Sequence, residues 1–216
     1  MKKIIYCFWT GENEMSDNRK ECLNSIKETT ECEVLCLFKD DIPNYILPEH
    51  PLHEGYKYLS ETHKADYLRT YFMNFYGGGY TDIKRQTGSW VDKFDLLEKS
   101  DKWIIGYGEN GSWDIAAPPE ISKHWDKLIG NGAYIAKPHT PLTEEWYSEM
   151  IYVLDGNLEK LKQFPSTFPQ DRCELNHGKY PIGWNQMLGR IFHKLSFKYI
   201  DKLIIGLPKL NFGNYR

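Results

Sequence analysis

Short apolar stretches alternate with amphipathic stretches along the chain. Residues 4–9 are apolar without interruption, as in buried strands, whereas residues 15–30 repeat apolar side chains at helical spacing. The sequence predicts strands over 2–11, 33–41, 78–85, 102–109, 131–138 and 201–208. It predicts helices over 15–30, 62–76, 92–100, 140–154 and 183–195. This alternation indicates an α/β layered sheet. We expect a single domain over residues 1–216, either acting as it stands or cut from a longer protein.

The predicted helix over 62–76 leads directly into three glycines and a short strand. Its apolar stripe, which we expect to pack on the sheet, consists of Ala65, Leu68, Phe72 and Phe75. Residues 77–79 end the helix, because glycine readily adopts the left-handed cap conformation. Three glycines in a row also let a backbone or a ligand approach closely, and we assign such a ligand contact to Gly78. The order is helix and then glycines, so this is not a dinucleotide-binding fingerprint.

Two charged pairs stand at opposite ends of this unit. Asp66 and Arg69 are three residues apart on the helix, so their side chains can meet as an ion pair or as a polar fork for phosphate or ribose. Asp82 and Lys84 project to the same side at the end of the strand, where α/β sheets bind ligands. Asp82 could hold a divalent cation through oxygen, and Lys84 could neutralise phosphate. The alternative is a surface pair with no role.

Charge and composition narrow the function classes. The net charge of −3 gives no global basic field that would attract nucleic acid. The five cysteines are an odd number without a disulfide framework, and the lone histidines His139 and His177 have no partner at metal-ligand spacing. The N-terminal apolar run is too short for a signal peptide, and no later run is long enough for a membrane span. We therefore expect no nucleic-acid partner, no membrane span and a cytoplasmic location.

Four stretches of the chain resemble a known group of enzymes. ADYLRTYFMNFYGGGYTDIK (65–84) is similar to the Ser-Asp-x-x-Arg, Tyr-Gly-Gly-x-Tyr and Asp-x-Asp signature of GT-A glycosyltransferases around family 32 and the capsular polysaccharide synthesis enzymes. KKIIYCFWTGEN (2–13), LIGNGAYIAKPHTPLTEEW (128–146) and YPIGWNQML (180–188) resemble other segments of that group. The resemblance runs from about residue 3 to residue 190. The small size also resembles the compact glycosyltransferase domains of large algal viruses (chloroviruses).

This resemblance implies a GT-A fold, which is Rossmann-like, with a mostly parallel central sheet flanked by helices. It implies transfer of a hexose or deoxyhexose from a UDP-sugar, such as UDP-glucose, to a glycan or glycoprotein acceptor. Retention of anomeric configuration is the outcome it favours. For a viral enzyme the location would be the host cytoplasm.

The same resemblance implies roles for individual residues. Asp66 and Arg69 would contact the donor, and Asp82 would anchor its diphosphate through Mn²⁺ or Mg²⁺ and act in catalysis. Asn131 would touch the transferred sugar. The uracil would lie where the first strand ends, against Phe8, Trp9 and Thr10.

One departure from the signature matters for the chemistry. Lys84 stands where the group has its second acid, so the motif reads Asp-Ile-Lys. Asp82 could still bind the cation, with water and phosphate filling the other positions. Alternatively, Lys84 and Arg85 could stabilise the diphosphate with less help from metal.

The loop over 109–114 is a candidate acceptor side. Trp113 could stack on the acceptor sugar, and Asp114 or Glu109 could deprotonate it in an inverting reaction. Trp184 could close the site from the C-terminal side.

Two other functions stay open. One is a sugar-nucleotide- or glycan-binding module that has lost catalysis, because of Lys84. The other is a glycoside hydrolase, which would need two acids facing each other across a cleft.

Overall fold

The computed structural model describes residues 1–175 and 179–215. Within them a six-stranded sheet has the order β2-β1-β3-β5-β4-β6. The strands are β1 (Ile4–Trp9), β2 (Glu33–Phe38), β3 (Gly78–Thr81), β4 (Ile104–Gly108), β5 (Ile129–Ala136) and β6 (Leu203–Ile205). β1 pairs in parallel with β2 and β3, and β4 pairs in parallel with β6. β5 is antiparallel to both of its neighbours, β3 and β4. The prediction of a mostly parallel α/β sheet is confirmed.

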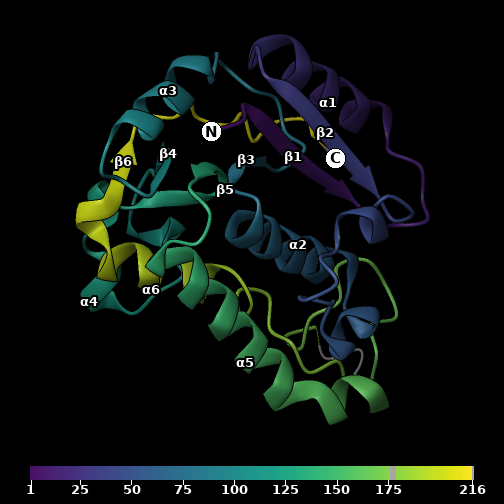
Figure 1. The fold of residues 1–216 in the computed structure, drawn as a ribbon. Helices are drawn as coiled ribbons and strands as arrows, with labels where there is room; N and C mark the ends of the chain where they lie inside the picture. Colours follow the sequence, from purple (N-terminus) through teal and green to yellow (C-terminus); the bar gives the residue numbers. More distant parts are fainter. Residues whose placement is uncertain (176–178, 216) are drawn as a thin grey trace.

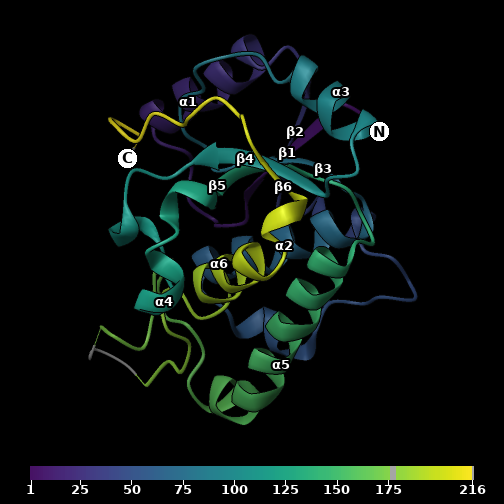
Figure 2. The same cartoon turned by 90° about the vertical axis from the view of Figure 1, so that its left-hand side faces the viewer.

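Helices cover both faces of this sheet (Figure 1). Figure 2 shows α1 (Asp17–Thr29) and α3 (Val91–Lys99) on one side of the sheet. On the other side lie α2 (Glu61–Phe75), α5 (Pro141–Gln163) and α6 (Gly189–Lys198). The short α4 (Pro119–Ser122) lies beside α6. Short 3₁₀ turns link the larger elements at Ile42–Tyr45, Glu54–Tyr58, Ser112–Asp114, Trp125–Lys127 and Ile200–Lys202.

Local sequence signals determine where the main helices begin. The Ser16 side chain accepts a hydrogen bond from the backbone of Arg19, and Ser60 caps α2 in the same way. Thr140 forms a reciprocal capping box at the start of α5, where Pro141 occupies the first turn. Such caps satisfy backbone N–H groups that have no partner within the helix. The predicted helix starts at residues 15–17, 61–62 and 140–141 are confirmed.

The central helix α2 is buried on nearly every side. Leu68 and Phe72 are fully buried against β1, where Phe72 contacts the rings of Tyr6 and Phe8 at centroid distances of 4.9 and 5.0 Å. Ala65 and Phe75 are partly buried at the edge of the same core. α5 packs on the opposite side of α2, so that α2 forms the middle of the core rather than a surface layer. Figure 1 shows this position.

Several predicted elements are shorter than expected, and two of these differences affect one edge of the sheet. β3 ends at Thr81, because the chain turns directly after it: the Asp82 N–H still donates to Gly132 O on β5 at 2.8 Å, but the Lys84 N–H turns back to Asp82 O at 2.7 Å. The helix predicted over 183–195 begins only at Gly189. Residues 184–188 form turns instead. Both changes leave polar side chains outside regular structure at one edge of the sheet.

The glycine run after α2 serves a tight turn. Gly77 has φ +64° and Gly78 has φ +97°, which is the left-handed region that glycine adopts at low cost. A Cβ on Gly77 would lie 2.5 Å from Pro138 Cδ. A Cβ on Gly79 would crowd Ile5 and Trp90 at 3.0 and 3.1 Å. These glycines therefore bring β3 close to its neighbours.

Among the described residues, none of the helices combines the length and the apolar character that crossing a bilayer requires.

Candidate active site

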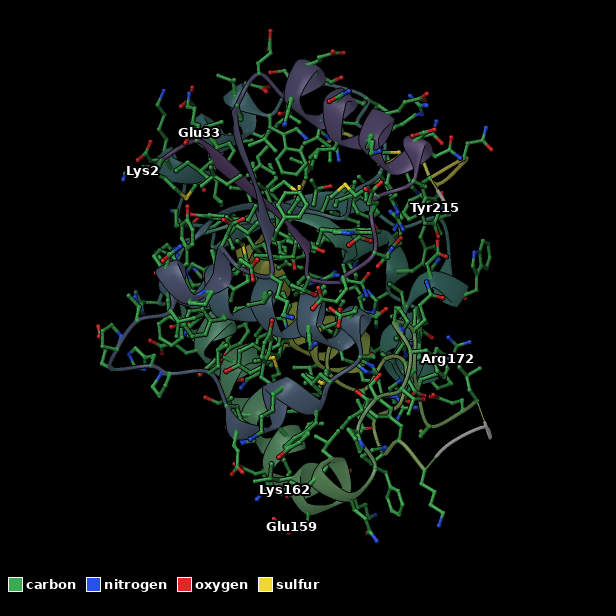
Figure 3. The ribbon with its side chains drawn as sticks, turned by 90° about the vertical axis from the view of Figure 1, so that its right-hand side faces the viewer. Lys2, Glu33, Glu159, Lys162, Arg172 and Tyr215 are labelled. Carbon is green, nitrogen blue, oxygen red and sulfur yellow. The ribbon has the colours of Figure 1, made fainter. Side chains whose placement is uncertain are left out.

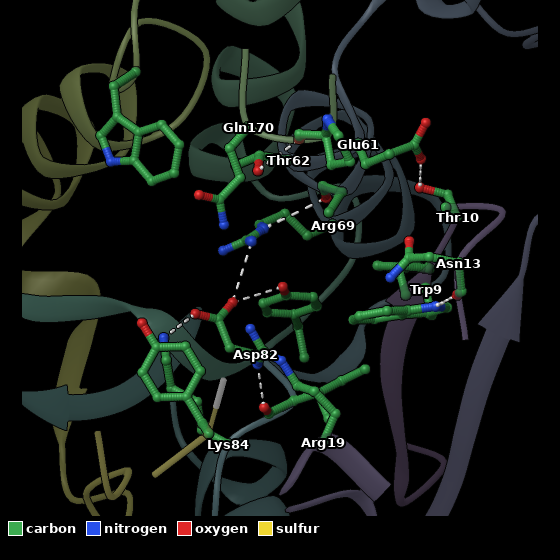
Figure 4. Close-up of a pocket in the computed structure, with 18 residues that line it drawn as sticks. Trp9, Thr10, Asn13, Arg19, Glu61, Thr62, Arg69, Asp82, Lys84 and Gln170 are labelled. Atoms are coloured by element: carbon green, nitrogen blue, oxygen red, sulfur yellow. Dashed lines mark hydrogen bonds and ion pairs between the residues drawn. The ribbon is translucent and has the colours of Figure 1, made fainter. Parts of the chain in front are cut away.

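A pocket of about 350 Å³ opens beyond the ends of β1 and β3. This edge is where open α/β sheets bind ligands, and the volume lies at the lower end of the range for small-molecule sites. Its walls come from the β1 end, the first turns of α1 and α2, the segment after β3, the irregular chain after α5, and the C-terminal segment (Figure 4). The lining residues are Phe8, Trp9, Thr10, Gly11, Asn13, Arg19, Glu61, Thr62, Ala65, Arg69, Tyr80, Asp82, Ile83, Lys84, Pro169, Gln170, Trp184 and Tyr215.

One side of the pocket combines an aromatic ring with polar groups. The Trp9 indole N–H donates to the Asn13 carbonyl at 2.8 Å, which fixes the ring at the end of β1. The Thr10 hydroxyl donates to Glu61 Oε2 at 2.6 Å. Figure 4 shows these groups across the cavity from Asp82. A flat ring beside exposed hydrogen-bonding edges suits a nucleobase and the hydroxyls of a ribose.

Asp82 is the centre of the opposite side. Its Oδ2 atom lies 2.6 Å from the Lys84 ammonium. Its Oδ1 atom lies 3.2 Å from Arg69 Nη2 and accepts a hydrogen bond of 2.8 Å from the Tyr80 hydroxyl. Burial alone would raise the pKa of Asp82, but the charges of Lys84 and Arg69 outweigh it and hold the pKa well below its usual range. The carboxylate is therefore ionised at neutral pH and cannot supply a proton.

Arg69 joins α2 to both β3 and β5. Its Nη1 atom donates to Asn131 O at 3.0 Å, and its Nη2 atom lies 3.3 Å from Asp66 Oδ1 as well as near Asp82. The guanidinium also stacks on the Tyr80 ring, with 4.3 Å between Cζ and the ring centroid. Most N–H donors of Arg69 are bonded to other groups of the protein. Arg69 therefore acts mainly as a positioning residue at the pocket.

Asp66 lies behind Arg69 and does not line the pocket. Its side chain is 4% exposed, and burial raises its pKa to about 7. Arg69 opposes this rise, whereas the negative charge of Asp82 adds to it. A single guanidinium is shared by two carboxylates, and only Asp82 has Lys84 as a second cation. Asp66 is therefore the carboxylate of the pair that takes up a proton.

We expect this titration to appear in the pH dependence of stability. A pKa raised in the folded state means that the stabilising contribution is complete below the unfolded pKa of 3.8 and is lost as the pH rises through about 7. Relative to the Asp66→Asn variant, the unfolding free energy of the wild type should fall by roughly 2 to 4 kcal/mol over this range. Urea unfolding of both proteins across the pH range measures the difference.

The comparison with Asp66→Asn also cancels the opposite pH dependence that two buried histidines contribute. Burial lowers the pKa of His63 and of His193 to about 4. The stability that each contributes to the folded protein is therefore lost as the pH falls through the same range. They titrate in wild type and variant alike, and their effects cancel in the difference. A difference that stayed constant with pH would show that Asp66 is ionised in the folded protein.

The residues around Asp82 do not fit a divalent cation. Mn²⁺ and Mg²⁺ bind through several oxygen ligands at short distance. Among the residues that the structure describes, no group of three or more His, Cys, Asp or Glu side chains is placed to hold a metal ion. Asp82 is also already bonded by two cationic side chains. A cation at Asp82 stays a prediction that this donor set does not support.

Several predicted site residues line the pocket and others do not. Phe8, Trp9, Thr10, Arg69, Asp82 and Lys84 line it, and so does Trp184. Gly78 lies at the far end of β3 from Asp82, against Ile4 O and the Tyr6 ring. The structure does not bring it to the pocket. His177 lies outside the described residues.

Three further candidates are not among the lining residues of the pocket. The side chain of Asn131 is not among the lining groups, although its carbonyl binds Arg69. The Asp114 carboxylate accepts hydrogen bonds from the Asn110 backbone and side chain at 3.1 and 3.0 Å, so it stabilises its own turn. Burial raises the pKa of Glu109 to about 7, helped by Asp114 and opposed by Lys209 and Lys84. A catalytic role for Asp114 stays a prediction.

Sequence reasoning missed several lining residues. Arg19 and Glu61 lie in the first turns of α1 and α2, where charged side chains are commonly read as parts of helix caps. Gln170 belongs to an irregular segment that reaches the pocket because Thr62 N–H donates to Pro169 O at 3.1 Å. Tyr215, labelled in Figure 3 near α1, lies under the Arg19 guanidinium at 4.6 Å. No sequence signal identifies the last two residues.

Comparison with known proteins agrees with this architecture. A family model described as capsular polysaccharide synthesis protein matches residues 1–92, which is less than half of the chain. No curated protein matches the chain. Among solved structures, one named "PaToxG Glycosyltransferase" is similar with a TM-score of 0.51 and 13% identity, over 93% of this chain and 69% of that chain.

These similarities show a glycosyltransferase-like fold over nearly the whole chain, with the likeness to capsular polysaccharide synthesis proteins confined to its first part. The narrower resemblances to family 32 and to viral enzymes stay predictions.

Proposed function

We propose that this protein is a glycosyltransferase that binds a UDP-sugar in the pocket and transfers its hexose or deoxyhexose to a glycan acceptor. One observation carries the proposal. The pocket has an aromatic and polar side at Trp9 and Thr10, and the cations Lys84 and Arg19 elsewhere on its wall, on the ligand-binding edge of a glycosyltransferase-like sheet. A nucleoside diphosphate sugar has a base and ribose at one end and a diphosphate at the other.

The chemistry of transfer matches the charges of the site. The bond between the anomeric carbon and the diphosphate oxygen breaks, and its electron pair stays on that oxygen. The acceptor hydroxyl oxygen then bonds to the anomeric carbon. Its proton goes to the departing diphosphate in a retaining reaction, or to Glu109 or Asp114 in an inverting one. Stabilising the negative charge on the leaving diphosphate is the largest task, and cations at the pocket supply it.

The geometry gives less support to the two other functions. Asp82 is held ionised between two cations, so it is a poor general acid for a glycoside hydrolase. A module without catalysis would bind a sugar nucleotide but transfer nothing, which activity measurements distinguish. We therefore propose a single function.

Calorimetric titration with UDP, UDP-glucose and other sugar nucleotides tests this function. We expect binding of UDP-sugars, and we expect Trp9→Ala to weaken it roughly tenfold to a hundredfold through the loss of base stacking. Tyr152→Ala is the matched control, because Tyr152 is an exposed aromatic on α5 outside the pocket. Its affinity for UDP should equal that of the wild type.

The outcomes separate the alternatives. Binding together with transfer to a glycan supports the enzyme. Binding without transfer to any tested acceptor would indicate a binding module instead. No binding of any sugar nucleotide would leave only a shared fold.

A further inference from the structure

Lys84 occupies the place next to Asp82 where a metal ion would bind. Its ammonium lies 2.6 Å from Asp82 Oδ2, and only 11% of its side chain is exposed. The tight turn from the Lys84 N–H to Asp82 O holds the two residues side by side. A cation bonded to Oδ2 would therefore meet an ammonium bonded to the same oxygen. Like charges at that separation repel strongly in a partly buried site.

The other oxygen of Asp82 is also engaged. Oδ1 accepts a hydrogen bond from Tyr80 and lies beside Arg69. Tyr80 is itself buried, so its hydroxyl would lose a partner if a metal took over this oxygen. The carboxylate is thus satisfied by the protein and does not act as an open ligand.

A second cationic side chain lies close to Lys84. Arg19, from the first turn of α1, lines the same pocket and donates to Ile83 O at 2.5 Å. Ile83 is the residue between Asp82 and Lys84 in the chain, so the two cations approach the pocket from adjacent positions (Figure 4). Together they carry two positive charges, which equals the charge of one divalent metal ion.

We propose that Lys84, assisted by Arg19, binds the donor diphosphate in place of a divalent cation, so that neither donor binding nor transfer needs metal. The inference rests on the proposed function and specifies how its site works. When the bond to the anomeric carbon breaks, the electron pair stays on the diphosphate oxygen, and the two side chains stabilise that charge. Asp82 positions the Lys84 ammonium and does not contact the diphosphate.

A lysine ammonium is suited to bind a diphosphate in this position. The ammonium is a compact charge with three donors on a flexible stem, and it binds phosphate as a point charge. Here Asp82 restrains the stem, which lowers the cost of ordering it when the donor binds. The Phe212 and Tyr215 rings lie 4.7 and 5.1 Å from the ammonium, and add a cation–π contribution that keeps it in place.

The test is calorimetric titration of the wild-type chain with UDP, first in EDTA and then in excess Mn²⁺, together with transfer assays under both conditions. We expect the affinity for UDP to be the same within twofold in EDTA and in Mn²⁺. Lys84→Ala and Lys84→Gln should weaken UDP binding roughly tenfold to a hundredfold in both conditions, because a hydrogen bond to a charged group is lost. Thermal unfolding confirms that each variant is folded.

Two further variants sharpen the comparison. Lys20→Ala is the matched control, since Lys20 is a cation next to Arg19 on α1 but is exposed, pairs with Asp17 and does not line the pocket. It should bind UDP as the wild type does. Lys84→Asp restores the Asp-x-Asp spacing, and should make UDP binding depend on Mn²⁺ and disappear in EDTA.

The results distinguish this inference from the proposed function. Wild-type binding that appears only with Mn²⁺ would overturn the role of Lys84 and keep the glycosyltransferase. Near-normal UDP binding by both Lys84→Ala and Lys84→Gln would also overturn it. No UDP binding in either condition would remove the proposed function, and the inference with it.

Discussion

Asp82→Asn should reduce turnover at least roughly a hundredfold while changing the affinity for UDP by less than about tenfold. The amide keeps the shape of the side chain but removes the charge that holds the Lys84 ammonium 2.6 Å away. An ammonium that moves by about 1 Å no longer faces the oxygen on which charge develops, and such misplacement costs about 10²-fold in rate. The added positive charge in the pocket meanwhile favours the anionic nucleotide. Steady-state kinetics together with calorimetry separate kcat from donor binding.

The same substitution should lower stability. Lys84 loses its carboxylate partner and Arg69 keeps only Asp66, in a site where the Asp82 side chain is 24% exposed. Leaving partly buried charges unpaired costs about 3 kcal/mol. Asp126→Asn, at an exposed position outside the pocket, is the control and should change neither property. Near-normal turnover of Asp82→Asn would refute its positioning role, and parallel losses of turnover and UDP affinity would indicate direct anchoring.

Gly77→Ala should destabilise the chain by about 3 kcal/mol. Its φ of +64° is unfavourable for alanine. The new Cβ would also lie 2.5 Å from Pro138 Cδ and 3.0 Å from Ala136 O, so that backbone must move on the neighbouring segment. For a chain of 216 residues this loss lowers Tm by roughly 6 to 12 °C. Calorimetric melting and urea unfolding both measure the effect.

Gly156→Ala is the control for this substitution. Gly156 is exposed within α5, and a Cβ there meets nothing within 4 Å. Alanine should stabilise the helix by about 0.5–1 kcal/mol, because it restricts the unfolded chain and favours helix. If Gly77→Ala melted like the wild type, the turn after α2 would tolerate a side chain and the close approach of β3 would have another cause.

Most of the fold could be predicted because its elements are encoded locally. The apolar run of β1 and the cap at Ser60 define their elements almost to the residue. The reversed direction of β5 could not be predicted, because the direction of a strand depends on pairing with β3 and β4 across the sheet. The end of β3 at Thr81 could not be predicted either, because the turn in which the Lys84 N–H bonds to Asp82 O lies within a sequence pattern that continues as a strand.

The candidate site likewise contains residues that could be predicted from the sequence and residues that could not. Trp9, Asp82 and Lys84 could be predicted, since they lie at or just after the ends of strands that form one edge of the sheet. Gln170 and Tyr215 could not, because they lie in irregular segments that tertiary contacts alone bring to the pocket. The ligand contact expected for Gly78 came from its place in a run of three glycines, whereas its φ shows that it serves the turn.

The hydrogen bonds from Asp82 and Arg69 to the start of β5 bear on how the protein can be divided. Residues 1–92 match the capsular synthesis model and contain Trp9, Arg69, Asp82 and Lys84. A fragment that ended there would lack Asn131 O for Arg69, Gly132 O for the Asp82 amide, and the wall at Gln170. Such a fragment would carry the signature without the site. The pocket is therefore not a transferable module, and a graft or truncation that aims to keep it must include the chain through Tyr215.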